Sequence, residues 1–275
     1  MDDNAAIAIF REYLRIRTVT EEVPDYVSVE TFLVQLAGQI GLSFQKVEQL
    51  TPDCRKWPIF ILAIPGSNPS NGSLLLHGHF DVVPVSSENW KHDPFGAELV
   101  DGRIYARGSQ DMKCVSIAYL CALDRLLHLN RTSSASHIPL FNRTVYVIFS
   151  SDEEIGGPTF SQFVISPYFL SLRPAFALDK GICSPSDQFI AFHSERSRIP
   201  VRFTIGGTSG HGTLLVPDTA GEKLRHLLDC VYDFRAVEQR RALEGVPDGQ
   251  LTGINLTVVK GGVQSNVVCA LIAIV

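Results

Sequence analysis

Apolar and polar positions follow two different periods along the first part of the chain. Apolar residues recur at helical spacing over Ala5–Ile16 and again over Val29–Ile40, which predicts two amphipathic helices. Ser28 is the predicted N-cap of the second helix, and Gly41 follows its last apolar residue, as is common at helix ends. Short apolar runs then predict β-strands, namely Phe44–Val47, Phe60–Ile64 and Leu74–Leu76.

Three apolar runs of strand length lead into side chains that bind metals or carry protons. These are Leu74–Leu76 before His79, Val145–Phe149 before Glu153 and Glu154, and Ala175–Leu178 before Asp179. A helix is predicted from about Asp111 to Leu129, and a surface loop from Asn130 to Pro139. Alternating strands and helices are typical of α/β folds, so we expect a mixed, mostly parallel sheet with helices on both faces. Such sheets place their chemistry at the carboxyl ends of the strands.

The pattern changes after about residue 190. The predicted elements are a strand over Ile199–Ile205, a glycine-rich loop over Gly206–Gly212, a long helix over Thr219–Arg241, and strands over Leu251–Val259 and Val267–Val275. This order predicts a small α+β unit joined to the first part by a short connection. We therefore expect two domains, over residues 1–190 and 191–275.

The amino-acid composition and the net charge exclude several classes of function. The chain has 275 residues, 45% hydrophobic and 19% charged, which is enough for one or two domains with buried cores. A net charge of −5 without a basic block argues against a nucleic-acid partner. The apolar runs are too short to cross a membrane, and Met1–Asn4 lacks the features of a secretory signal. The 6 cysteines form no Cys-x-x-Cys pair, so we expect a cytoplasmic protein without a disulfide framework.

Histidine and carboxylates at several strand ends suggest a two-metal hydrolase site. The side chains with the identities of zinc ligands are His79, Asp111, Glu154 and Asp179. Two divalent ions would lower the pKa of bound water and polarise a carbonyl, as amide hydrolysis requires. Asp81 lies two residues after His79 and is expected to orient its imidazole. Glu153 and Glu154 are adjacent, so we expect one to serve as the base and the other as a ligand.

Each of these residues also has a structural interpretation when it is taken alone. A histidine at the end of a strand is commonly structural, Asp111 fits a helix cap, and Asp179 fits an ion pair with Lys180. Taken together, however, these positions all carry side chains of the types that bind metals, which favours a metal site over separate structural roles. His77 is expected on the other side of the strand from His79, in a structural role. For His211, in the glycine-rich loop, substrate contact and a turn role are equally compatible with the spacing.

Several segments together resemble one enzyme family. They are Leu76–Val85, Trp90–Phe95, Ile104–Lys113, Asp152–Gly157, Phe10–Val19, Phe176–Asp179 and Ser194–Ser197. The chain is similar along nearly its whole length to the aminoacylase family of zinc-dependent N-acyl-L-amino-acid amidohydrolases. That family lies within the co-catalytic metallopeptidases, which include carboxypeptidases and dipeptidases. The resemblance implies a zinc exopeptidase-like fold, with a catalytic metal-binding domain over 1–190 and a dimerisation domain over 191–275.

The resemblance also implies roles for individual residues. One zinc ion would bind His79, Asp111 and Asp179, and a second would bind Asp111 and Glu154, with Asp111 as the bridge. Glu153 would be the general base and acid, and Asp81 the partner of His79. His211 would reach the active site of a neighbouring subunit in a homodimer, and Asn266 would contact an N-acyl amino acid substrate.

One departure from the family concerns the C-terminal part. The family continues past the position of Val275 and supplies a last metal-binding histidine and an arginine for the substrate carboxylate, so we expect a truncated relative with an incomplete second domain. Three interpretations therefore stand: an aminoacylase-type hydrolase, a dipeptidase or carboxypeptidase relative, and a non-catalytic product that pairs with full-length subunits.

Overall fold

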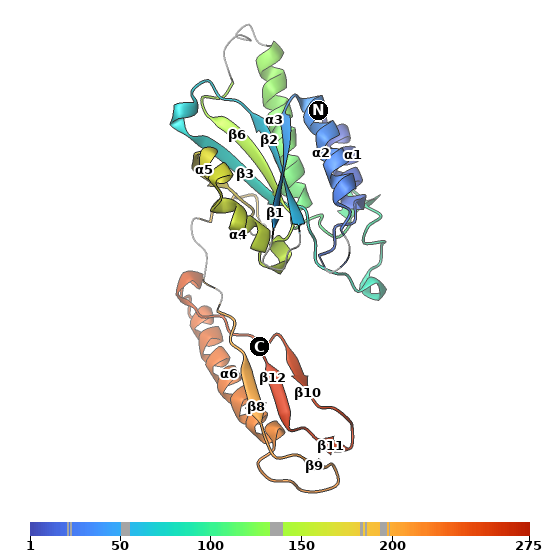
Figure 1. Cartoon of the computed structure of the whole chain (residues 1–275), viewed down its shortest axis with the longest axis vertical. Helices are drawn as coiled ribbons and strands as arrows, with labels where there is room; N and C mark the ends of the chain where they lie inside the picture. The colour runs from blue at the N-terminus through green and yellow to red at the C-terminus, as the bar shows by residue number, and fades with distance from the viewer. Residues whose placement is uncertain are drawn as a thin grey trace. The chain divides into compact units, whose positions relative to one another are not determined.

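The computed structural model divides the chain into two compact units, Met1–Ile190 and Ala191–Val275 (Figure 1). The structure describes all residues except 21, 23, 51–55, 133–139, 182, 183, 185, 193–196 and 198. Part of the segment Ser194–Ser197, which carries some of the family resemblance, lies outside the described residues. The catalytic and dimerisation roles of the two units stay predictions.

The first unit is built on a mixed five-stranded sheet with the order β1-β2-β6-β3-β7. Its strands are β1 (Ser43–Leu50), β2 (Lys56–Ile64), β3 (Ser73–His79), β6 (Thr144–Ser150) and β7 (Pro174–Leu178). β3 pairs in parallel with both β6 and β7, whereas β2 pairs antiparallel with β1 and β6. Four of the five strands therefore run in one direction, which agrees with the predicted mixed, mostly parallel sheet.

Helices cover both faces of this sheet, as predicted (Figure 1). The helices are α1 (Asp3–Arg15), α2 (Tyr26–Ile40), α3 (Lys113–Thr132), α4 (Pro158–Val164) and α5 (Pro167–Ser171). The larger core joins α1, α2 and α3 to one face through residues such as Leu33, Phe60 and Phe149. The smaller core joins α4 and α5 to the other face around Phe163 and Ile148. Burial of these apolar side chains stabilises the layers and fixes the strand ends relative to one another.

Shorter elements connect the layers of the first unit. They are the hairpin of β4 (Glu98–Val100) and β5 (Arg103–Tyr105), and the 3-10 turns η1 (Pro69–Asn71), η2 (Ser87–Asn89) and η3 (Glu153–Ile155). No helix among the described residues is both long and apolar enough to cross a membrane.

The second unit is a small α+β structure. Its elements are β8 (Phe203–Gly206), β9 (Gly210–His211), α6 (Ala220–Leu243), η4 (Asp248–Gln250), β10 (Val259–Gly261), β11 (Val267–Val268) and β12 (Leu271–Ile274). β12 pairs antiparallel with β10 and β8, and α6 packs on β12 and β8. Thr219 and Glu222 form a capping box at the start of α6, which satisfies free amide groups of its first turn.

Several sequence-based boundaries differ from the structure. Asp25, rather than Ser28, caps α2, because its carboxylate accepts the backbone N–H of Ser28. The predicted strand Leu251–Val259 is wrong except for its last residue, because β10 begins only at Val259; before it, Thr257 and Val258 hydrogen-bond to the backbone of Val275 without forming a strand. The predicted final strand is divided into β11 and β12. α3 continues to Thr132, and the rest of the predicted loop, 133–139, lies outside the described residues.

Candidate metal and catalytic site

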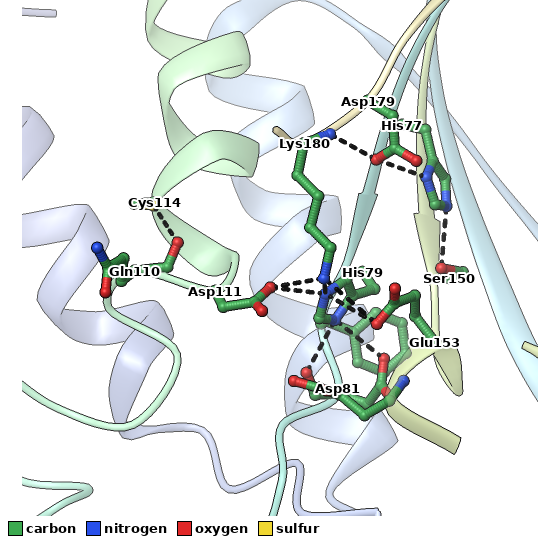
Figure 2. A network of polar contacts seen from close by, with 12 residues as sticks. His77, His79, Asp81, Gln110, Asp111, Cys114, Ser150, Glu153, Asp179 and Lys180 are labelled. Carbon is green, nitrogen blue, oxygen red and sulfur yellow. Dashed lines mark hydrogen bonds and ion pairs between the residues drawn. The ribbon is translucent and has the colours of Figure 1, made fainter. Parts of the chain in front are cut away.

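The candidate site lies where three parallel strands end. β3 and β6 are in register up to the pair His79 and Ser150, and β7 ends next to β3 where Leu178 faces Leu76. Because parallel strands share a direction, the residues that follow them meet at one edge of the sheet. The loop before α3 brings Asp111 to this edge (Figure 2). The sheet topology thus brings together residues that are far apart in the sequence.

Three of the predicted ligands converge. His79, Asp111 and Glu154 each offer one ligand atom, and these atoms lie within 4.8 Å of one another. One imidazole nitrogen and two carboxylates are donors that suit zinc or a similar divalent ion. The side chain of His79 is fully buried, whereas that of Asp111 is half-exposed. The three residues therefore fit one divalent cation.

Asp81 fixes the imidazole of His79. The Nδ1 atom of His79 lies 3.0 Å from the Asp81 carbonyl oxygen and 3.2 Å from its carboxylate Oδ1. Both are acceptors, so Nδ1 carries a proton and Nε2 is left as the ligand atom. Burial lowers the pKa of His79, but the hydrogen bond and charge of Asp81 outweigh burial, and the net pKa is raised. Asp81 Oδ2 also accepts the Glu154 N–H at 2.9 Å. This hydrogen bond connects Asp81 to the turn that carries Glu153 and Glu154.

Glu153 and Glu154 follow β6 on the turn η3 and take different positions. Glu153 Oε2 lies 3.4 Å from His79 Nε2, and its side chain is partly exposed. Glu154 is partly buried and belongs to the ligand group. Burial raises the pKa of Glu154, and the nearby charges of Asp111 and Glu153 raise it further, although His79 opposes the change. The two adjacent acids thus have different surroundings.

Asp179 does not join the ligand group. Its Oδ1 lies 3.1 Å from His77 Nδ1. Burial raises the pKa of Asp179, but the hydrogen bond and charge of His77 outweigh it, so the net pKa is lowered. The expectation that His77 lies on the other side of β3 from His79 is wrong, since side chains two residues apart on a strand share a face. His77 also bonds Ser150 at 3.0 Å and stacks on Phe160.

Lys180 lies within the site, although the sequence gave it no role beyond an ion pair with its neighbour. Its Nζ is 2.9 Å from His79 Nε2, 2.8 Å from Asp111 Oδ1 and 3.3 Å from Glu153 Oε2 (Figure 2). Burial lowers the pKa of Lys180, but its hydrogen bond to Asp111 and the nearby carboxylates outweigh burial and raise it. The adjacency of Lys180 to the predicted ligand Asp179 was the one available signal in the sequence.

Asp111 is ionised in these surroundings. Burial raises its pKa, but the hydrogen bond and charge of Lys180, together with His79, outweigh burial and lower the pKa. Asp111 precedes α3, which begins at Lys113, rather than lying within the helix. Its carboxylate therefore faces His79 and Lys180.

The two predicted substrate residues of the second unit lie next to one another. His211 ends β9 and faces Val267 of β11, and Gly212 donates its N–H to the Asn266 carbonyl at 2.8 Å. The exposed His211 imidazole has its Nδ1 2.8 Å from Thr213 Oγ1. The roles of His211 and Asn266 toward a substrate stay predictions.

Comparison with known proteins identifies the relatives of this chain. Residues 75–206 match the model described as peptidase family M20/M25/M40. The chain is 45% identical to aminoacylase-1 of Sus scrofa over 98% of its own length and 63% of that protein. It is 44% identical to aminoacylase-1 of Homo sapiens, over 98% of its length and 64% of that protein. It is also 34% identical to aminoacylase-1 of Dictyostelium discoideum, over 96% of its length and 63% of that protein.

Solved structures share the fold at low sequence identity. An M20-family metallo-carboxypeptidase from Sulfolobus solfataricus matches with a TM-score of 0.65 and 17% identity, over 100% of this chain and 70% of that one. A di-peptidase from Saccharomyces cerevisiae matches with a TM-score of 0.62 and 16% identity, over 98% of this chain and 68% of that one. The aminoacylase-1 relatives are longer than this chain, which spans less than two thirds of the length of each of the three named above.

Proposed function

We propose that this chain hydrolyses N-acyl-L-amino acids to a carboxylate and a free L-amino acid, since it is 45% identical to aminoacylase-1 of Sus scrofa and matches the model of the peptidase family M20/M25/M40 over residues 75–206. The observation that carries the proposal is the convergence of His79, Asp111 and Glu154 in a chain that is 45% identical to such a relative. Dipeptidases of the same fold are similar at only 16% identity, so aminoacylase activity is the better supported proposal.

The ligand group is proposed to hold zinc. His79 would donate through Nε2, and Asp111 and Glu154 through carboxylate oxygens; the support is the proximity of the three donors. A bound divalent ion supplies charge that lowers the pKa of water and polarises the acyl carbonyl. Asp179 stays a predicted ligand, although its carboxylate contacts His77 in this structure.

Glu153 is proposed as the general base and acid. Its carboxylate is partly exposed and lies 3.4 Å from His79 Nε2, so it borders the metal group and also reaches solvent. A carboxylate in this position takes a proton from the attacking water and returns it to the amine leaving group. Asp81 would orient His79 throughout, because it holds the imidazole in one tautomer.

Two residues of the second unit are proposed to act on the substrate. His211 and Asn266 lie next to one another at the β9 and β11 pair. We propose that Asn266 contacts the substrate and that His211 serves the active site of the neighbouring subunit in a homodimer. The support for these two roles is the resemblance to the family and the adjacency of the residues.

The test is hydrolysis of N-acetyl-L-methionine by the purified chain with added zinc. Glu153→Ala is expected to reduce kcat by about 10²–10⁴-fold, the usual contribution of a general base. Glu244→Ala, at an exposed position after α6, is the matched control and should leave the rate unchanged. A dipeptide substrate run in parallel separates amidohydrolase from dipeptidase activity. Equal rates for Glu153→Ala and the wild-type chain would refute the proposed role.

A further inference from the structure

Asp152 lies between the end of β6 and the two adjacent acids of the site. It is 0% exposed, and it directly precedes the turn η3, which carries Glu153 and Glu154. Asp152 belongs neither to the ligand group nor to the residues proposed above for catalysis. A buried carboxylate at this place in the chain needs a physical explanation, since burying a charge is costly unless the charge has partners.

The two adjacent acids need a turn in order to reach one site. Consecutive side chains of a β-strand point to opposite faces of the sheet, so a continued β6 would carry Glu153 and Glu154 apart. In the turn, Glu153 Oε2 lies 3.4 Å from His79 Nε2 (Figure 2), and Glu154 belongs to the ligand group. The change of direction directly after Asp152 therefore brings both carboxylates to the same site.

The backbone of Asp152 closes this turn. Its carbonyl oxygen accepts the Gly157 N–H at 2.8 Å. The Glu153 carbonyl oxygen accepts the Gly156 N–H, also at 2.8 Å. These two hydrogen bonds form a Schellman motif, with Gly156 in the left-handed region at φ 96°. The backbone path of both acids is thus fixed by bonds that begin at Asp152.

The carboxylate of Asp152 connects the turn to α4. Its Oδ2 accepts the backbone N–H of Thr159, in the first turn of α4, at 2.7 Å. Both residues are fully buried, so bulk solvent does not compete for this bond. The Asp81 carboxylate accepts the Glu154 N–H at 2.9 Å, so Asp152 and Asp81 together hold the turn at two points.

We propose that Asp152 is a positioning residue of the site, which holds η3 in the shape that directs Glu153 and Glu154 to the metal ion. It acts through these two acids and not on the ion or the substrate. This inference rests on the proposed function, since it concerns the geometry of that site.

Zinc affinity, measured by competition with a chromogenic chelator, tests the inference without substrate. Asp152→Ala removes the side-chain acceptor and should weaken zinc binding by about 10–100-fold, as loss of a supporting contact does at other metal sites. Asp152→Asn keeps an oxygen for the Thr159 N–H and should bind zinc nearly as tightly as the wild type. Ile59→Ala, at a fully buried position of β2 in the smaller core, is the matched control: it should lose stability but keep its zinc affinity.

Two glycine variants test the turn while Asp152 stays in place. Among the described residues, a Cβ at Gly156 meets no atom within 4 Å beyond its own neighbours in the chain, so Gly156→Ala strains only the backbone. The same holds for Gly102, at φ 75° in the β4 and β5 hairpin, so Gly102→Ala is the matched control. We expect weaker zinc binding in Gly156→Ala alone, and this comparison replaces Asp152→Ala if circular dichroism shows that variant to be unfolded.

Three results would each overturn the inference: wild-type zinc affinity in Asp152→Ala, an equal loss of affinity in Asp152→Asn, or equal affinities in Gly156→Ala and Gly102→Ala. In the hydrolysis assay, Asp152→Ala should lower kcat by about 10²-fold with little change in KM, because the acids are misplaced while substrate binding is kept. The proposed function is tested separately by N-acetyl-L-methionine hydrolysis and Glu153→Ala, so the two can fail independently.

Discussion

The buried Lys113 should make the stability of the first unit depend on pH. Its side chain is only 1% exposed, and its ammonium donates to the carbonyls of Tyr13 at 3.2 Å and Ile16 at 2.8 Å. Burial lowers the pKa of Lys113 from 10.5 to about 7, although the charge of Asp81 opposes the change. The folded chain therefore loses this proton at a lower pH than the unfolded chain does.

The sign and the size follow from this difference in pKa. Between the folded value of about 7 and the unfolded value of 10.5, the unfolded chain binds more protons, so the free energy of unfolding rises with pH. Each pKa unit corresponds to about 1.4 kcal/mol, and a difference of about 3.5 units amounts to roughly 5 kcal/mol in full. Between pH 7 and pH 10 the contribution of Lys113 should be on the order of 3 to 4 kcal/mol.

Urea unfolding at pH 7, 8, 9 and 10 measures the effect. Tryptophan fluorescence reports on the first unit alone, because both tryptophans, Trp57 and Trp90, lie within it. A chelator in the buffer removes any contribution from bound cations. Lys113→Met leaves the Ile16 carbonyl without this donor, which costs about 1–3 kcal/mol at every pH, whereas the Tyr13 carbonyl still accepts the Ile16 N–H. The expected signature is therefore a smaller slope with pH in Lys113→Met, rather than a uniform change in stability.

Lys91→Met, at an exposed position, should keep the wild-type slope. Parallel pH dependence in the wild type and Lys113→Met would refute the reasoning, because it would mean that Lys113 keeps an ordinary pKa in the folded chain.

Three further changes have defined outcomes. Asp81→Asn should weaken zinc binding by about 10–100-fold, because His79 loses its orienting carboxylate; competition with a chromogenic chelator measures this, and unchanged affinity would contradict it. Phe163→Ala, in the smaller core, should lower the free energy of unfolding by about 3–5 kcal/mol, whereas the exposed Ile165→Ala should change it little in the same urea titration. Thr219→Ala removes the capping side chain of α6 and should cost about 1 kcal/mol, seen as faster hydrogen exchange of the first amides of α6; equal exchange would argue against the cap.

Local patterns in the sequence were sufficient to predict the main helices and most strands of the first unit. The apolar spacing over Ala5–Ile16 and Val29–Ile40 agrees with α1 and α2 to within a few residues, because the apolar face of a helix must be buried against the sheet. Apolar runs likewise located β2, β3 and β6. Leu251–Val259 was predicted as a strand on the same grounds, but only Val259 belongs to one, since a strand needs a partner strand along its whole length.

Side-chain contacts within the site depended on the fold. The sequence singled out His79, Asp111 and Glu154 through residue type and position, and these three converge. It could not show that Asp179 contacts His77, or that the side chain of Lys180 enters the ligand group. Those contacts join residues about 100 positions apart, so they depend on the order of β3 and β7 in the sheet.

The sequence by itself determined the residue types at the strand ends, the helical and strand periods, and the similarity to aminoacylase-1. Only the tertiary structure decided which of these side chains meet. The parallel pairing of β3 with β6 and β7 brings three strand ends to one edge, where distances of a few ångströms decide which side chains pair with the carboxylates. Coulomb energy falls with distance and with solvent exposure, and both quantities are set by the packed fold rather than by the spacing of residues along the chain.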